Sequence, residues 1–287
     1  MTVRERVAAH TGPAGRVQVA DPLPLTWASA LAMAAVGVVG FVAFAWPFLV
    51  PTEAALAHGQ DAPWFFAVLL ALLAAVLLAE VSSGRLEPKT ITVIAVVVAT
   101  GGALRVLSAG TAGLEAMFFV VIVAGRVLGR GIGFVCGALA LVTGAFLTGG
   151  VGPWLPFQMV NAGWVGLLAA CLPRCGGWAE RWLLAAYALI SGLLYGAAMN
   201  LWFWPFLGAA APTGAGFVPG AGWQANLGHY ATFYVATSLA WDLPRGILNA
   251  VLVLLAGGPV LAVLRRAARR AAFDAAPRFE PEETRCP

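Results

Sequence analysis

Long apolar runs alternate with short connections rich in polar residues, glycine and proline along most of the chain. A membrane-spanning helix needs about 20 mostly apolar residues. The fourth of the runs below is short enough to be partly re-entrant, which leaves the count open by one. The eight expected spans are Thr26 to Val50, Trp64 to Glu80, Thr90 to Leu107, Leu114 to Leu128, Ile132 to Thr148, Leu155 to Leu172, Trp182 to Leu207 and Gly246 to Leu264.

One connection is unusually rich in residues that disrupt helices. Residues 149 to 166 read GGVGPWLPFQMVNAGWVG, with two prolines, several glycines and the amides Gln158 and Asn161. Proline removes a backbone donor, and glycine weakens a helix interior. Interrupted backbone at membrane depth is tolerated only where protein buries it or where it lines a wet cavity. The pattern predicts a pocket beside this segment.

Composition supports a multi-pass membrane protein. The chain is 61% hydrophobic and 10% charged, with a mean hydropathy of +0.86, whereas soluble domains average about 25% charged residues. The N-terminal stretch of residues 1–25 is too long and too proline-rich for a secretory n-region, so the first apolar run is expected to be retained as a span. We therefore predict an all-α polytopic protein of the inner (cytoplasmic) membrane.

The distribution of positive charge predicts the orientation. We place the connections on alternating sides of the membrane, with the N-terminus inside. Of the 17 Lys and Arg, Arg105 and Arg245 then fall near the outer side, and the other 15 fall in cytoplasmic segments. The positive-inside rule therefore favours cytoplasmic N- and C-termini. The outer connections are then 51–63, 108–113, 149–154 and 208–245, the last of which contains HYATFYVATSLAW, a candidate surface helix or pocket cover.

Several kinds of chemistry lack their sequence signatures. The histidines His10, His58 and His229 are scattered, and no HExxH, P-loop or G-x-S-x-G motif occurs, so neither catalysis nor a bound metal or other cofactor is expected. The cysteines form no CxxC pair and are interpreted as structural thiols. The arginines at the span ends show no aromatic interleaving, which argues against nucleic-acid binding. Any ATP hydrolysis would belong to another subunit.

A few ionisable residues fall within or beside the spans. Glu80 lies at a cytoplasmic end and is interpreted as a boundary residue, whereas Arg105, Glu115, Asp242 and Arg245 fall on the outer side. Charges at membrane depth are costly and suggest function, although near the interface they can pair. Both interpretations of the outer four, a structural ion pair and contact with a ligand, stay open.

Aromatic and amide residues gather on the same side. Trp154, Phe157, Gln158, Asn161 and Trp164 follow helical spacing after Pro156 and predict one stripe. An interfacial aromatic belt is the alternative for the tryptophans. The complete set of expected substrate-binding residues is Trp154, Phe157, Gln158, Asn161, Trp164, Asn200, Trp204, Asn226, His229, Trp241, Arg245 and Asn249.

Small residues recur every four positions at Ala95, Ala99 and Ala103. Such spacing lets helices approach closely, either inside the protein or against a partner. Gly133 and Gly137 have the same spacing and are expected to pack internally.

From Ile91 to Leu264 the order of features resembles the substrate-capturing S subunits of energy-coupling-factor (ECF) importers, which are six-span vitamin binders. The matching stretches include the alanine-repeat span ending LRVL, IVAGRVLGRGIGFVCGALALVTGAF, GVGPWLPFQMVNAGWVGLLAACLP, MNLWFWPF and RGILNAVL. GPWLPFQM is the most specific of these, and it is similar to the CbrT-like actinobacterial members associated with cobalamin uptake.

The resemblance implies a domain organisation. Residues 1–25 would be a cytoplasmic tail, 26–89 an additional two-helix hairpin, 90–264 the six-helix core and 265–287 a basic cytoplasmic tail. The resemblance also implies that Ala95, Ala99 and Ala103 dock a transmembrane coupling subunit that works with two ABC ATPases.

In this interpretation the chain is the substrate-binding subunit of a vitamin importer, and its transported ligand is cobalamin or a related corrinoid. Riboflavin would suit the same aromatic and amide residues. Two alternatives from other classes stay open: a membrane enzyme acting on lipid or isoprenoid with Asp242, Glu115 and His229 as acid and base, and a secondary transporter driven by ion gradients.

Overall fold

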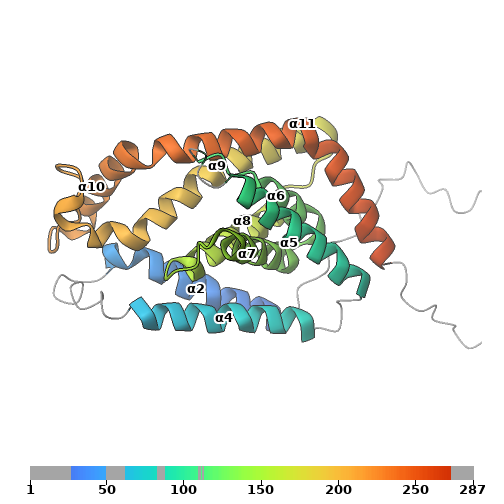
Figure 1. The fold of residues 1–287 in the computed structure, drawn as a ribbon, viewed down its shortest axis with the longest axis horizontal. Coiled ribbons are helices and arrows are strands. Elements are labelled where there is room, and N and C mark those ends of the chain that lie inside the picture. Colours follow the sequence, from blue (N-terminus) through green and yellow to red (C-terminus); the bar gives the residue numbers. More distant parts are fainter. Residues whose placement is uncertain (1–26, 50–61, 83–87, 109–110, 112, 273–287) are drawn as a thin grey trace, which may run out of the picture.

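A computed structural model describes residues 27–49, 62–82, 88–108, 111 and 113–272 of the chain. The expected cytoplasmic tail 1–25, the end of the chain beyond residue 272 and most of the outer connection 51–63 lie outside these residues. Every regular element in the described part is helical (Figure 1). The main helices are α2 (Trp27–Leu49), α4 (Ala62–Ser82), α5 (Pro88–Ser108), α6 (Met117–Leu128), α7 (Arg130–Thr148), α8 (Leu155–Cys171), α9 (Gly177–Phe203), α10 (Gly222–Thr237) and α11 (Leu239–Ala272).

Each expected apolar run coincides with one helix, and the last helix begins at Leu239 rather than at Gly246. Within the described residues, five helical segments are long and apolar enough to cross a membrane: Trp27–Leu49, Pro88–Ser108, Arg130–Thr148, Gly177–Phe206 and Leu239–Arg269. Helices α6 and α8 are shorter apolar helices. At 1.5 Å per residue α6 reaches only about 18 Å, less than the ~30 Å hydrocarbon core. The structure therefore supports a multi-pass membrane protein without establishing eight complete spans.

Glycines bring the central helices α6, α7 and α8 into backbone contact. A Cβ added to Gly133 would lie 2.7 Å from the Gly166 carbonyl oxygen, and one added to Gly137 would lie 2.2 Å from the Ala162 oxygen. A Cβ on Gly125 would meet the same Gly166 oxygen at 2.0 Å. Because packing rather than hydrophobicity drives helix association in lipid, small residues at these contacts let the helices approach closely. Gly133 and Gly137 pack internally, as predicted.

The N-terminal hairpin of α2 and α4 packs on α8 and lies along the edge of the molecule opposite α11 (Figure 1). Phe44 of α2 contacts Phe157 and Trp164 of α8, with ring centroids 5.4 and 5.8 Å apart. The far end of α2 places Phe48 against Trp204 and Tyr230, in the connection between α9 and α11. The hairpin therefore covers one face of α8 and supports the outer connection.

Helix α5 buries one side and leaves the other open. Ile94 and Val97 pack against α6, α7 and the C-terminal end of α11, in a cluster that includes Leu264 and Ala268. Ala95, Ala99 and Ala103 lie on the exposed side. The principal contacts of the hairpin are with α7, α8, α9 and α10.

A buried ion cluster connects α6, α9 and α11 at the end of the molecule predicted to be cytoplasmic. Glu180 is 2% exposed and accepts from Arg126 Nε at 2.8 Å and from Arg265 Nη2 at 2.6 Å. Arg126 also donates to the carbonyls of Leu172 and Pro173. This cluster joins α6, the α8–α9 connection, α9 and α11.

Candidate ligand pocket

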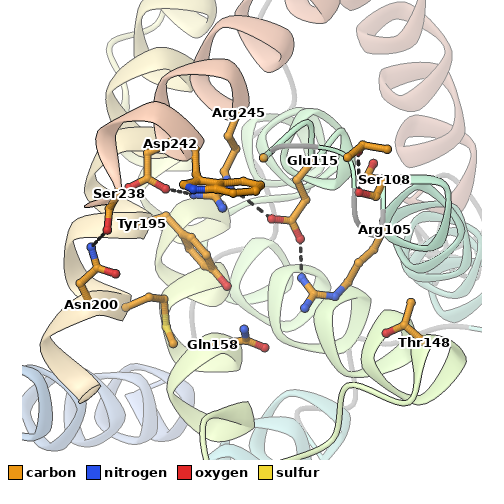
Figure 2. Close-up of a pocket in the computed structure, with 15 residues that line it drawn as sticks. Arg105, Ser108, Glu115, Thr148, Gln158, Tyr195, Asn200, Ser238, Asp242 and Arg245 are labelled. Atoms are coloured by element: carbon orange, nitrogen blue, oxygen red, sulfur yellow. Dashed lines mark hydrogen bonds and ion pairs between the residues drawn. The ribbon is translucent and has the colours of Figure 1, made fainter. Parts of the chain in front are cut away.

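A polar cavity of about 440 Å³ lies where the ends of several helices meet (Figure 2). Helix α5 contributes its C-terminal end, α8 its N-terminal turns, α9 its second half and α11 its N-terminal turns. The topology predicted above places all of these ends on the outer side. The lining residues are Arg105, Ser108, Thr111, Gly113, Glu115, Thr148, Gln158, Tyr195, Gly196, Met199, Asn200, Ser238, Trp241, Asp242 and Arg245.

Four charged residues form an alternating chain across one wall of the cavity (Figure 2). Glu115 pairs through Oε1 with Arg105 and through Oε2 with the Nε of Arg245, the latter at 3.3 Å. Arg245 also pairs through Nη1 with Asp242 Oδ1. Their side chains are at most 17% exposed. Buried charges are tolerated only when they are paired in this way, and we call this chain the ion-pair tetrad.

Asn249 holds the middle of the tetrad in place. Helix α6 has no side-chain cap of its own at Ala116. The Asn249 Oδ1 of α11 accepts from the Phe119 backbone N–H at 2.6 Å, and the same N–H also makes a longer bond of 3.2 Å to the Ala116 carbonyl. The Asn249 Nδ2 donates to the carbonyls of Glu115 and Arg245, at 2.7 and 2.8 Å. The Asn249 side chain therefore holds the backbone at both Glu115 and Arg245, the two central residues of the tetrad.

Two glycines make room for the α11 side of the tetrad. A Cβ on Gly196 would lie 1.8 Å from Asp242 Oδ2, so the carboxylate packs directly against the backbone of α9. Gly113 has a φ of +81°, and a Cβ there would lie 2.0 Å from the Trp241 carbonyl oxygen. Any larger residue at either position would push α11 away from α9 or from the α5–α6 connection.

Three buried polar atoms that line the cavity have no hydrogen-bond partner within the described part of the chain: Gln158 Oε1, the Tyr195 hydroxyl and Asp242 Oδ2. The Tyr195 ring is held between Phe118, 4.6 Å away between centroids, and the guanidinium of Arg245, 5.3 Å from the ring. Buried polar groups are rarely left unpaired in native proteins. These atoms make the cavity a candidate ligand site.

Helix α10 closes over the outer end of α9. Tyr230 and Tyr234, one turn apart, donate their hydroxyls to the carbonyls of Ala197 and Leu193. Burial raises the pKa of Tyr234 to about 12, so its hydroxyl remains a donor at neutral pH. Beside them, Asn200 Nδ2 donates to the Ser238 hydroxyl at 2.5 Å. The connection 208–245 thus supplies a helix that covers this end, as the HYATFYVATSLAW segment suggested.

Four of the expected substrate-binding residues line the cavity: Gln158, Asn200, Trp241 and Arg245. Asn249 is buried outside the lining and donates to the carbonyl of Arg245. These residues come from three helices, α8, α9 and α11, so the structure brings together parts of the expected set that are up to 91 positions apart in the sequence.

The remaining expected residues lie outside the lining. On α8, Phe157 and Trp164 face α2, and Asn161 Nδ2 donates to the Tyr195 carbonyl at 2.9 Å. Trp154 is 36% exposed and donates to the Gly150 carbonyl. Around α8 the expected single stripe therefore divides between the cavity, α9 and the hairpin.

In the outer connection, Trp204 is fully buried and donates to the Ala215 carbonyl at 2.8 Å. Asn226 holds residue 218 through both its amide oxygen and its amide nitrogen. His229 Nδ1 is buried without a partner among the described residues, away from the cavity lining. Trp204 and Asn226 therefore hold the outer connection together, and none of the three residues lines the cavity.

The expected set omits several lining residues. Arg105, Glu115 and Asp242 were singled out by their charge at membrane depth. The structure confirms that they form ion pairs and places them in the cavity lining, whereas contact with a ligand stays a prediction. Tyr195, Met199, Ser238 and Thr148 carried no distinguishing sequence signal. Glu80 falls in α4, and its side chain lies outside the described set. The described residues also contain no cluster of potential metal ligands.

A family model described as ECF transporter, substrate-specific component, matches residues 89–257. This region begins in α5, leaves the hairpin of α2 and α4 outside and ends within α11. It includes every residue of the cavity lining. Searches of the curated proteins and of the solved structures found no match to the chain.

Proposed function

The chain belongs to the family of ECF transporter substrate-specific components, and from this premise we propose that it captures a vitamin at the outer face of the inner membrane. Members of this family are transporter subunits rather than enzymes. They bind a small molecule and generally associate with a transmembrane coupling subunit and ABC ATPases. The membrane-enzyme and secondary-transporter alternatives are therefore set aside.

The observation that carries this proposal is the 440 Å³ cavity with its three unpartnered buried polar atoms. Pockets for drug-sized ligands span roughly 300–1,000 Å³ and contain a few well-placed polar groups. The cavity meets both conditions. It also lies at the helix ends that the charge distribution predicts to be external, which is where a capture subunit needs its binding site.

We propose a corrinoid as the first ligand to test, because the GPWLPFQM segment contributes Gln158 to the cavity and corrinoid side-chain amides can pair with Gln158 and Asn200. A corrinoid is larger than a drug-sized ligand, so its entry requires the helices around the cavity to move apart. A vitamin of riboflavin size is the second candidate, since the volume of 440 Å³ accommodates it without such a movement.

The test is equilibrium binding of a vitamin panel to the purified full-length chain in lipid nanodiscs without ATP or partner subunits. We expect saturable binding of one panel member with a stoichiometry near one. Retention of cobalamin identifies the corrinoid, and retention of riboflavin identifies the smaller ligand. The absence of binding across the panel would refute the capture function.

We further propose that α5 docks the coupling subunit through Ala95, Ala99 and Ala103. Residues four apart lie on the same side of a helix, and all three are exposed. Ile91 and Leu107, which are 49% and 77% exposed, extend the same row at both ends. The principal contacts of the hairpin lie elsewhere, which supports an accessible docking face on a core of residues 90–264.

The double variant Ala95→Trp/Ala99→Trp should abolish ATP-driven uptake in cells that carry the complete transporter, because two indoles prevent close approach of a partner helix. Vitamin binding by the isolated variant should stay unchanged, since both positions lie away from the cavity. Leu194→Trp on α9, at a site that is 62% exposed, is the matched control and should transport normally. Normal uptake by the double variant would remove the docking assignment.

A further inference from the structure

The charged residues of the cavity lining are balanced in number. Arg105 and Arg245 oppose Glu115 and Asp242, and these four are the charged members of the lining in the described part of the chain. We infer that the ligand is an electrically neutral molecule that presents hydroxyl or amide N–H donors, and that the ion-pair tetrad discriminates against anionic analogues. This inference rests on the proposed capture function and narrows its substrate class.

The pairing geometry explains why an anion is disfavoured. Glu115 occupies both arginines, one through each carboxylate oxygen, and Arg245 is shared with Asp242. Neither guanidinium is therefore left with its full charge for a ligand. Sites that recognise carboxylate or phosphate frequently use arginine as a bidentate donor, and here the guanidinium N–H groups already serve Glu115 and Asp242. An anion entering this cavity would add an uncompensated buried charge, which is strongly unfavourable.

The unpartnered atoms explain why the ligand must carry donors. Asp242 is 3% exposed, and its Oδ2, as a carboxylate oxygen, only accepts hydrogen bonds. The buried Gln158 Oε1 is also an acceptor. Tyr195, which is 4% exposed, has a hydroxyl that can donate or accept. In Figure 2 these side chains surround the same space, with Tyr195 extending between Asp242 and Gln158. A neutral ligand with at least two donors would satisfy the acceptors without adding charge.

Matched pairs of probes that share one scaffold test this inference. We propose to measure binding of riboflavin and flavin mononucleotide, of nicotinamide and nicotinic acid, and of cyanocobalamin and its monocarboxylic acid derivative. The protein is the full chain in nanodiscs. For the scaffold that binds, we expect the anionic member to bind at least about tenfold more weakly, which corresponds to ~1.4 kcal/mol.

The outcomes separate the two proposals. If one scaffold binds and its anionic member binds equally well or better, the neutral-ligand inference is wrong and the capture function stands. If no member of any pair binds, the capture function itself fails.

Charge-changing variants provide a second test. Asp242→Asn removes one negative charge and leaves Arg245 in excess, so the preference for the neutral member should shrink at least about threefold, because the surplus positive charge now attracts the anion. Glu115→Gln should shift the preference in the same direction. Glu180→Gln is the matched control, because it neutralises a similarly buried, arginine-paired carboxylate at the opposite end of the molecule.

The readout is the ratio of the two affinities, which a general loss of stability does not change in a fixed direction. An unchanged ratio in both Asp242→Asn and Glu115→Gln, with the neutral member still bound, would overturn the role of the tetrad. If neither variant retains binding, the affinity ratio of the neutral and anionic members for the wild-type chain decides whether the neutral-ligand inference holds.

Discussion

The contact between Gly196 and Asp242 gives a sharp prediction. In Gly196→Ala, the new Cβ would lie 1.8 Å from Asp242 Oδ2 and 2.1 Å from Oδ1, whereas real Cβ contacts are not found below 3.0 Å. The carboxylate must therefore retreat by more than an ångström or α11 must move away from α9. Either movement breaks the pairing of Asp242 with Arg245 and displaces one of the free acceptors in the cavity.

Two free-energy contributions of opposite sign determine the effect of Gly196→Ala on stability. Alanine in place of glycine inside a helix stabilises by roughly 0.5–1 kcal/mol. Overpacking of a tight contact costs about 1–3 kcal/mol. Asp242 and Arg245 are 4% and 13% exposed at their side chains, so disturbing their pair adds to this cost. We expect net destabilisation, together with a loss of ligand affinity of at least about tenfold from one lost hydrogen bond to a charged group.

The assays are thermal and SDS-titrated unfolding in detergent, and binding of the vitamin that the wild type retains. Gly228→Ala in α10 is the matched control, because a Cβ there meets nothing within 4 Å. It should be neutral or slightly stabilising. A Gly196→Ala protein as stable as this control would contradict the close approach of the two helices.

A double-mutant cycle identifies the atoms responsible. In an Asp242→Ala background the carboxylate is gone, so adding Gly196→Ala should cost at least about 1 kcal/mol less than in the wild type, within the range measured for contacting residues. An equal cost in both backgrounds would show that the destabilisation arises elsewhere.

Further predictions concern the residues that support the cavity and its cover. Asn249→Ala should destabilise the protein by about 1–3 kcal/mol, because it removes the bond to the Glu115 carbonyl and leaves the Phe119 N–H with its longer bond of 3.2 Å to the Ala116 carbonyl. Unfolding measurements check this, and a loss no greater than that of an exposed alanine substitution on α11 would refute it. Trp204→Phe keeps a ring in the cluster with Tyr230 but removes the donor to the Ala215 carbonyl, so limited proteolysis of the 208–221 connection should accelerate while the core remains intact. Unchanged proteolysis would show that the hydrogen bond does not hold the connection.

The apolar pattern was sufficient to locate the helices. Each predicted run coincides with one helix, because about 20 consecutive apolar residues have few alternatives to a helix in a bilayer. The pattern could not establish that α6 is only 12 residues long. It also placed the start of α11 too late, at Gly246, because the polar residues Asp242 and Arg245 interrupt the apolar run although the helix continues through them.

The candidate site was predicted only in part. Helical spacing grouped Gln158 with Phe157, Asn161 and Trp164 in one stripe, but spacing cannot say which neighbour covers each side of a helix. Phe157 and Trp164 face α2, and Asn161 bonds to α9. Tyr195 and Ser238 carried no sequence signal, because their role depends on helices that meet only in the folded chain.

The sequence by itself determined that this chain is a helical membrane protein, and it predicted that four charged residues lie at the outer ends of the spans. Hydrophobicity and charge are properties of each segment alone. Only the tertiary structure decided that Arg105, Glu115, Asp242 and Arg245 form a single balanced chain around a cavity, because pairing depends on the approach of α5, α6, α9 and α11. That approach is set by glycines such as Gly196, whose importance lies in the neighbour they admit.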